Sequence, residues 1–190
     1  KLEGYADQDT LFVLAGSVPQ GVPKDIYYKI TELVHQRGAK VLLDADGELF
    51  TKALKAVPDI IKPNRVELEQ YAGMDYIASE QELLSAAEKL MEKGIGTVAV
   101  SMGKSGAVFL MEGMKVRCPG LKVKAHSTVG AGDAMVAALS YSWSEGKSPE
   151  DTVKMCMAVS AGAVTTIGTK PPSMDVVSSL LEQVVLEEVK

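Results

Sequence analysis

A carboxylate beside a glycine-rich turn is the feature of this sequence best suited to chemistry. The stretch Thr128–Met135 reads TVGAGDAM and places Asp133 directly after Gly130, Ala131 and Gly132. Glycines permit unusual backbone angles, and the free N–H groups and positive dipole at a helix start suit an anion such as phosphate. A carboxylate would repel that phosphate unless it takes a proton from an attacking hydroxyl group. The alternative is that Asp133 only satisfies the helix dipole.

The segments around this turn predict a strand before it and a helix after it. Residues 121–125 alternate apolar and polar side chains, and residues 134–141 are rich in helix formers. Elsewhere apolar runs and amphipathic patterns alternate along the chain. Further strands are predicted at 11–15, 41–44, 59–62, 97–101, 107–111 and 115–118, and helices at 24–37, 49–56, 66–71, 80–93, 148–163 and 176–189. This alternation predicts one α/β domain with a mainly parallel sheet.

Polar side chains follow several of these strands. Ser17, Asp44, Asn64 and Ser101 each come at or just after the end of a predicted strand, and the loop of Asp133 follows another. Ligands of parallel α/β sheets bind beyond the carboxyl ends of the strands. We therefore expect these five side chains, from five separate segments, to face one site.

Composition sets limits on the class of protein. The 190 residues are 46% hydrophobic and carry a formal net charge of −5, so a globular fold is expected and a nucleic-acid partner is not. No apolar run reaches membrane-spanning length and no signal peptide is visible, which favours a cytoplasmic protein. Cys118 and Cys156 form no Cys-x-x-Cys pair and are expected to be buried or incidental thiols, with a disulfide or metal site as the alternative.

The residues Ser127–Asp133, STVGAGD, closely resemble the signature of the phosphofructokinase-B branch of the ribokinase-like sugar kinases. The Ser-Thr-Val variant is most similar to the 1-phosphofructokinase and tagatose-6-phosphate kinase group. The resemblance implies a three-layer ribokinase-like fold and ATP-dependent transfer of a phosphoryl group to a phosphorylated ketohexose, of the fructose 1-phosphate or tagatose 6-phosphate class. It assigns the backbone of Gly130, Ala131 and Gly132 to an anion hole and Asp133 to the general base that contacts the sugar, with Thr128 and Gly132 at the nucleotide.

Two further motifs carry the same resemblance. Asn64 and Glu67 match the family's Asn-x-x-Glu, which implies that they hold Mg²⁺ through water; the alternative is a helix cap with its capping-box partner, and both can hold at once. Ser101, Gly103 and Gly106 match the Ser-x-Gly-x-x-Gly nucleotide loop, for which the alternative is an ordinary strand connection. The lysine of this loop does not follow the second glycine, so it is not a Walker motif.

The resemblance implies further contacts that rest on fewer residues. The carbonyls near Ser127 and Val129, with a loop like 165–169, would hold a monovalent cation such as K⁺. Ser17, in an Ala-Gly-Ser-x-Pro variant of the family's Ser-Gly-Ser-x-Pro, would contact the sugar phosphate. The helix at 155–162 would lie near the adenine, although its small residues equally permit tight helix packing.

The match extends over nearly all 190 residues but corresponds to the C-terminal, nucleotide-binding part of a complete family member. The family's N-terminal strands, its β lid and most of its sugar-recognition residues have no counterpart here. We therefore expect weak or absent kinase activity from the isolated chain, and an exposed apolar sheet edge that favours association or a homo-oligomer. The alternative function is a nucleotide-binding module without catalysis. A Rossmann dehydrogenase fits less well, because the third glycine of its fingerprint is absent.

Overall fold

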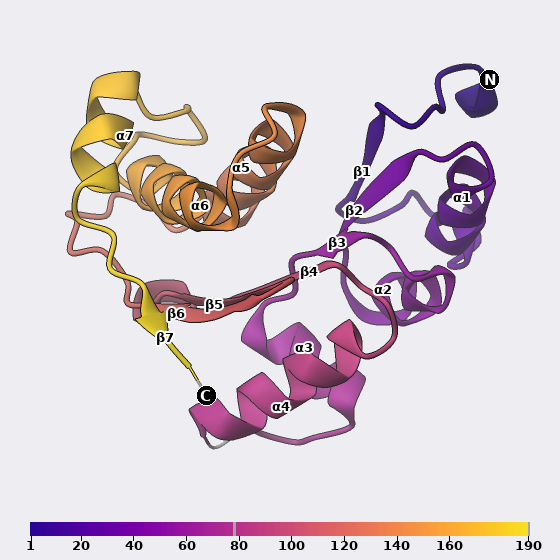
Figure 1. Cartoon of the computed structure of the whole chain (residues 1–190), viewed down its shortest axis with the longest axis horizontal. Coiled ribbons are helices and arrows are strands. Elements are labelled where there is room, and N and C mark those ends of the chain that lie inside the picture. The colour runs from indigo at the N-terminus through magenta and orange to yellow at the C-terminus, as the bar shows by residue number, and fades with distance from the viewer. Residues whose placement is uncertain (78, 190) are drawn as a thin grey trace. The chain divides into compact units, whose positions relative to one another are not determined.

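The computed structural model describes residues 1–77 and 79–189. It forms two compact units, residues 1–100 and 101–190 (Figure 1). The strands of the first unit are parallel and those of the second are antiparallel, so the α/β class and the mixed, mostly parallel character of the strands are confirmed. The prediction of a single domain stays a prediction.

The first unit is built on parallel strands that pair in chain order. These are β1 (Leu11–Ala15), β2 (Lys40–Asp44), β3 (Ile60–Ile61) and β4 (Thr97–Ser101), whose last residue is the first of the second unit. The helical elements are η1 (Leu2–Gly4), α1 (Ile26–His35), α2 (Gly47–Ala53), η2 (Leu54–Ala56), α3 (Arg65–Ala72) and α4 (Glu80–Met91). Because consecutive parallel strands are neighbours and crossovers are right-handed, α1 to α4 lie on the same side of the strands (Figure 1).

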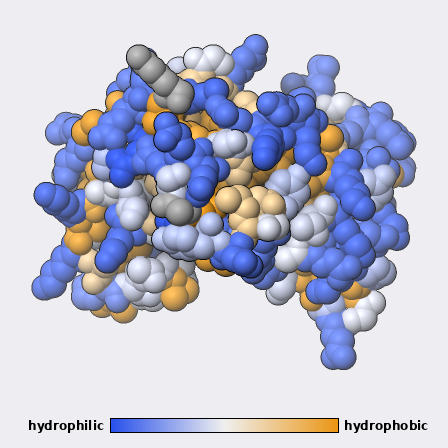
Figure 2. All heavy atoms as spheres, turned by 90° about the horizontal axis from the view of Figure 1, so that it is seen from below, coloured by the Kyte–Doolittle hydropathy of each residue, from blue (hydrophilic) through white to orange (hydrophobic). Residues whose placement is uncertain are grey.

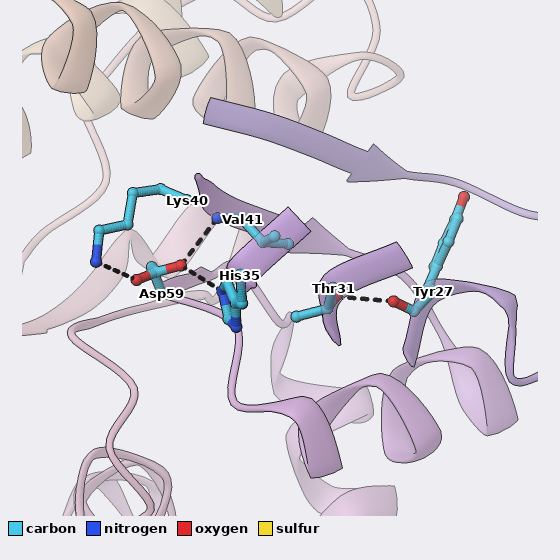
Figure 3. Close-up of polar contacts among 6 residues, drawn as sticks. All are labelled: Tyr27, Thr31, His35, Lys40, Val41 and Asp59. Atoms are coloured by element: carbon cyan, nitrogen blue, oxygen red, sulfur yellow. Dashed lines mark hydrogen bonds and ion pairs between the residues drawn. The ribbon is translucent and has the colours of Figure 1, made fainter. Parts of the chain in front are cut away.

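The carboxylate of Asp59 joins three elements at the amino ends of β2 and β3 (Figure 3). It accepts hydrogen bonds from His35 Nε2 at the end of α1, from Lys40 Nζ and from the Val41 N–H, each at 2.9 Å. Partial burial acts to raise the pKa of Asp59, but these hydrogen bonds outweigh it and hold the pKa below its usual range. The charged carboxylate therefore fastens α1 and the start of β2 to the start of β3.

The second unit packs helices with an antiparallel set of strands. The strands are β5 (Ala107–Met111), β6 (Met114–Cys118) and β7 (Glu187–Glu188), and the helices are η3 (Gly103–Ser105), α5 (Ala131–Ser144), α6 (Pro149–Ala163) and α7 (Met174–Leu181). Helix α6 contacts both α5 and α7. Cys118 and Cys156 are buried and unpaired, as the sequence predicts. Burial raises the pKa of Cys118 to about 12, so this thiol is unreactive.

Two predicted elements are wrong. Residues 121–125 form no strand; instead Leu121 and Val123 pack against the apolar side chains of α6 and α7, which explains their alternation without a sheet partner. The helix predicted at 176–189 ends at Leu181, and the chain continues to β7, which pairs with β6. There Arg117 Nη1 lies 2.8 Å from Glu187 Oε2, a contact between segments far apart in sequence that periodicity does not reveal.

Hydrophilic side chains cover most of the face shown in Figure 2, with apolar side chains scattered between them. In the part of the chain that the structure describes, every helix is too short or too polar to span a bilayer.

Candidate functional site

The turn before Asp133 has the geometry that its glycines predict. Gly130 is the N-cap of α5 and has φ +86°, a left-handed angle that favours glycine. The first helical hydrogen bond runs from the Ala134 N–H to the Gly130 carbonyl at 2.8 Å. The N–H groups of Gly132 and Asp133 therefore precede the first hydrogen bond of the helix, and they lie at the positive end of the helix dipole. Asp133 is exposed in the first turn, so a ligand can reach its carboxylate.

Hydrogen bonds from α6 hold this turn in place. The His126 N–H donates to the Val164 carbonyl at 2.7 Å, and the Ser127 N–H reaches the same oxygen at 3.4 Å. Ser160 Oγ donates to the Ala131 carbonyl at 3.1 Å. These bonds bring the segment around Ser127 next to the end of α6 and the loop that follows it. The two segments predicted to share a monovalent cation are therefore adjacent.

A pocket of about 250 Å³ opens beside Asp133 within the second unit. Apolar side chains of α5, α6 and the following loop form most of its wall, and Asp133 and Lys170 are the charged residues that line it. Its lining residues are Val129, Gly130, Asp133, Ala134, Ala137, Val159, Ala163 and Thr169–Pro172. Asp133 thus lines a cavity rather than being covered by packing.

The small residues of α6 serve packing. A Cβ on Gly162 would lie 2.8 Å from the Pro172 Cβ, and Ala158 is fully buried against Val177 and Leu180 of α7. The close approach of α6 to α7 and to Pro172 accounts for both residues. Their expected role beside an adenine ring is therefore not needed to explain them.

In the first unit, Asn64 and Glu67 form the capping box of α3. Asn64 Oδ1 accepts from the Glu67 N–H at 2.9 Å, while Glu67 Oε2 accepts from the Asn64 N–H at 2.8 Å and Glu67 Oε1 from Asn64 Nδ2 at 2.7 Å. The structural alternative for this pair is therefore confirmed, and the metal role stays a prediction. Both glutamate oxygens are already hydrogen-bonded, which suits contact with a hydrated ion better than direct ligation.

Charged side chains gather around Glu67. Lys62 is buried, and its Nζ lies 2.9 Å from Asp44 Oδ1. Burial raises the pKa of Glu67 above its usual range, and the charges of Asp44 and Asp46 act in the same direction, while the hydrogen bond from the Asn64 N–H and the charge of Lys62 oppose them. This corner therefore carries three carboxyl groups against one ammonium group.

The loop of Ser17 lies beside the same corner. The Gly16 N–H donates to the Asp44 carbonyl at 2.8 Å, and the Tyr27 hydroxyl donates to the Ala15 carbonyl at 2.9 Å. Ser17 follows directly and is exposed. The structure thus places the predicted residues Ser17 and Asn64 at neighbouring strand ends, on either side of β2.

The loop from Ser101 to Gly106 closes on itself, because the Met102 N–H donates to the Gly106 carbonyl at 2.9 Å. Gly106 has φ +102°, and a Cβ there would overlap the backbone of residues 118–120 at the end of β6. Close approach of two backbone segments therefore explains this glycine, as the alternative of a structural strand connection requires. The nucleotide role of Ser101, Gly103 and Gly106 stays a prediction.

The residues that carry Asp133 belong to the second unit, whereas Ser17, Asp44 and Asn64 belong to the first. Their convergence on one site stays a prediction. Sequence reasoning overlooked Lys62 and Lys170. A lysine at the end of the predicted apolar strand 59–62, directly before Pro63 and Asn64, is the signal that could have identified the first of these.

A magnesium ion fits this chain only with few protein ligands. Within residues 1–77 and 79–189, no three His, Cys, Asp or Glu side chains are grouped so that they could hold a metal ion. Mg²⁺ commonly keeps several waters and binds through one or two carboxylates and the phosphates of a substrate. The Asn64–Glu67 pair, with the negative charges around it, fits that arrangement.

Comparison with known proteins supports the resemblance. Residues 1–175 match the family model described as pfkB family carbohydrate kinase. The chain is 36% identical to the 1-phosphofructokinase of Haemophilus influenzae over 175 residues, which cover 92% of this chain and 56% of that protein. It therefore spans little more than half the length of this relative.

Solved structures show the same similarity. Phosphofructokinase-2 of Escherichia coli in complex with potassium superposes with a TM-score of 0.89 and 26% identity, over 96% of this chain and 59% of that one. The ribokinase of Arabidopsis thaliana complexed with ribose and ATP superposes with a TM-score of 0.75 and 25% identity, over 90% and 55% of the two chains. The ribokinase-like fold is thus confirmed.

Proposed function

The chain belongs to the pfkB family of carbohydrate kinases, and from that premise we propose that it binds ATP and transfers its terminal phosphoryl group to a hydroxyl of a phosphorylated ketohexose. The relative from Haemophilus influenzae is named a 1-phosphofructokinase. Fructose 1-phosphate is accordingly the first acceptor to test, and tagatose 6-phosphate the second. In this proposal the protein is a soluble enzyme of the cytoplasm, and its partners are ATP and a sugar phosphate.

One observation carries the proposal: Asp133 is exposed in the first turn of α5, beside a pocket and next to the leading N–H groups of the helix. Asp133 Oδ accepts the proton of the acceptor hydroxyl as its oxygen attacks the terminal phosphorus of ATP. The bond from that phosphorus to the bridging oxygen breaks, and ADP leaves with the electron pair. The backbone of Gly130, Ala131 and Gly132 stabilises the charge on the migrating group.

The other contacts are assigned to the segments that the family motifs match. Asn64 and Glu67 would hold hydrated Mg²⁺, which would neutralise phosphate charge when bound. Ser101, Gly103, Gly106 and Thr128 contact the nucleotide. Ser17, whose loop lies against the Asp44 backbone, contacts the sugar phosphate.

Carbonyl groups near Ser127 and Val129 and the loop after α6 would hold K⁺. The adjacency of these segments supports this assignment, since Val129 and Thr169 line the same pocket. The E. coli structure to which the chain is similar was solved in complex with potassium.

A second function is a nucleotide-binding module without catalysis of its own. The matched residues span about 56% of the Haemophilus influenzae relative, and phosphoryl transfer needs substrates held in a productive geometry whereas nucleotide binding alone does not. Both functions share nucleotide binding and differ in phosphoryl transfer.

Calorimetry with ATP and Mg²⁺, followed by a transfer assay with fructose 1-phosphate, separates the two functions. For the kinase, Asp133→Asn leaves nucleotide binding in place and lowers transfer by about 10²–10⁴-fold, because the general base is lost. Asp175→Asn is the matched control, since Asp175 also lies in the first turn of a helix, α7, and should change neither quantity. Binding without measurable transfer by the unaltered chain supports the module, and equal transfer by the Asp133→Asn variant refutes the role of this carboxylate.

A further inference from the structure

Lys62 is an unusual residue because its charge is buried. It is 5% exposed, and among the described residues it is the only lysine or arginine that is buried. Its Nζ lies 2.9 Å from Asp44 Oδ1, and the two side chains are 6% and 16% exposed. Removing two charges from water costs more than their attraction commonly returns, so a buried ion pair is weak grounds for stability alone. A role in fixing the local geometry explains the pair better.

The ion pair lies where the ends of β2 and β3 meet the loop after β1. The Lys62 N–H donates to the Leu43 carbonyl at 3.1 Å, and the Asp44 carbonyl accepts from the Gly16 N–H at 2.8 Å. The pair therefore joins the ends of β2 and β3. The loop after β1 is hydrogen-bonded to the end of β2 through Gly16. Pro63 and Asn64 follow Lys62 directly, so the direction in which the chain enters α3 depends on this junction.

The charges nearby make the position of Asp44 important. Asp44, Asp46 and Glu67 give the corner an excess of negative charge over the single charge of Lys62. Such a corner attracts a divalent cation, but a free Asp44 carboxylate could turn toward that cation and compete with the nucleotide phosphates for it. The ion pair with Lys62 holds the Asp44 carboxylate in one place.

We propose that the Lys62–Asp44 ion pair is a positioning element of the corner formed by Asn64 and Glu67. It holds the β3–α3 turn and fixes the position of the Asp44 carboxylate, so that a hydrated Mg²⁺ with its nucleotide meets a fixed surface. The inference rests on the proposed function, because it presumes that magnesium and nucleotide bind at this corner. The two residues do not themselves take part in phosphoryl transfer.

The test separates positioning from stability with two variants of the whole chain. Lys62→Met leaves the partly buried Asp44 without its ionic partner, so we expect a lower melting temperature and weaker binding of ATP with Mg²⁺. The double variant Lys62→Met with Asp44→Asn removes both charges with little change in volume and should recover most of the melting temperature. If the pair positions the site, the double variant still binds magnesium–ATP about 10–100-fold more weakly, the range found for residues that orient metal ligands. Calorimetry measures the affinity, and thermal unfolding without ligand measures the stability.

Lys52→Met is the matched control, because Lys52 Nζ also lies 2.8 Å from a carboxylate, that of Glu48, but on an exposed face of α2. It should leave both the affinity and the melting temperature unchanged. Unchanged affinity in the double variant overturns the positioning role, whatever the melting temperature. If the unaltered chain binds no ATP in a magnesium-dependent way, the proposed function fails first and this inference fails with it.

Discussion

The side chain of Asp59 joins helix α1 and strand β2 to the start of β3. Its two carboxylate oxygens accept hydrogen bonds from His35, Lys40 and the Val41 N–H (Figure 3). Its backbone carbonyl accepts from the Gly96 and Thr97 N–H groups at 3.0 Å. Because the ionised form makes these bonds, the pKa is held below its usual range in the folded chain. The contribution of Asp59 to stability is therefore complete above the unfolded-state pKa and is lost as the pH falls through the folded-state pKa.

We predict that Asp59→Asn lowers the free energy of unfolding by about 1–3 kcal/mol at pH 7, because an amide cannot replace the charged acceptor. The difference from the unaltered chain should shrink as the pH falls below about 4, where the carboxyl of the unfolded chain is protonated. Urea unfolding at pH 7 and at low pH measures this. Asp9→Asn, at an exposed position, is the control and should have little effect at either pH. A loss of the same size at both pH values would contradict the ionic origin of the effect.

At the scale of elements, two helices begin with the same motif but in different surroundings. Asn64 and Glu67 start α3, and Ser79 and Glu82 start α4; both pairs are complete capping boxes. Only the first lies beside Lys62 and Asp44. The capping role is therefore shared, while the surrounding charge distinguishes the corner proposed to bind magnesium.

The two capping-box glutamates should differ in their effect on magnesium-dependent ATP binding. Glu67→Gln and Glu82→Gln keep a side chain that can complete the box, so each should cost less than about 1 kcal/mol of stability. Glu67→Gln should nevertheless weaken magnesium-dependent ATP binding by about 10–100-fold, because a charged group that orients the hydrated ion is lost. Glu82→Gln should leave that binding unchanged. Titration of both variants with ATP at fixed Mg²⁺ measures this difference in affinity. Equal affinities of the two variants would assign Glu67 to capping alone.

Local sequence patterns predicted most helices and strands, but not the contacts between segments that are distant in sequence. The apolar runs at β1, β2, β4 and β5 and the Ser148–Pro149 start of α6 could be identified because their signals lie within a few neighbouring residues. The segment 121–125 was mistaken for a strand because burial against two helices produces the same alternation. The pairing of β7 with β6 and the contact of Gly162 with Pro172 depend on distant partners, which a linear pattern does not contain.

The candidate site likewise has features that a short sequence motif predicts and features that depend on residues distant in sequence. Gly130 and the Asn64–Glu67 pair could be predicted because glycine-rich turns and capping boxes have short sequence signatures. The pocket beside Asp133 could not, since its wall comes from α5, α6 and the loop ending at Pro172. Lys62 was overlooked because burial of a lysine depends on its partner, Asp44, which lies on another strand.

At the scale of the whole molecule, β1 is a strand edge that carries apolar side chains. It pairs with β2, and within the described residues no strand pairs with its other edge. Val13 in the middle of this strand is 43% exposed, while Leu14 beside it is buried. An edge strand with unpaired backbone groups and exposed apolar side chains is a template for pairing with another chain.

We therefore predict that the chain associates with itself through β1 and that Val13→Lys shifts it toward the monomer. A charged side chain in the middle of an edge strand opposes pairing with a second copy, because the two ammonium groups would lie close together and lose solvation. Sedimentation velocity over a range of protein concentrations measures the shift, and Val66→Lys on the exposed face of α3 is the control for added charge. Equal association of the two variants would place the contact elsewhere. Monomeric behaviour of the unaltered chain at every concentration would contradict the predicted association.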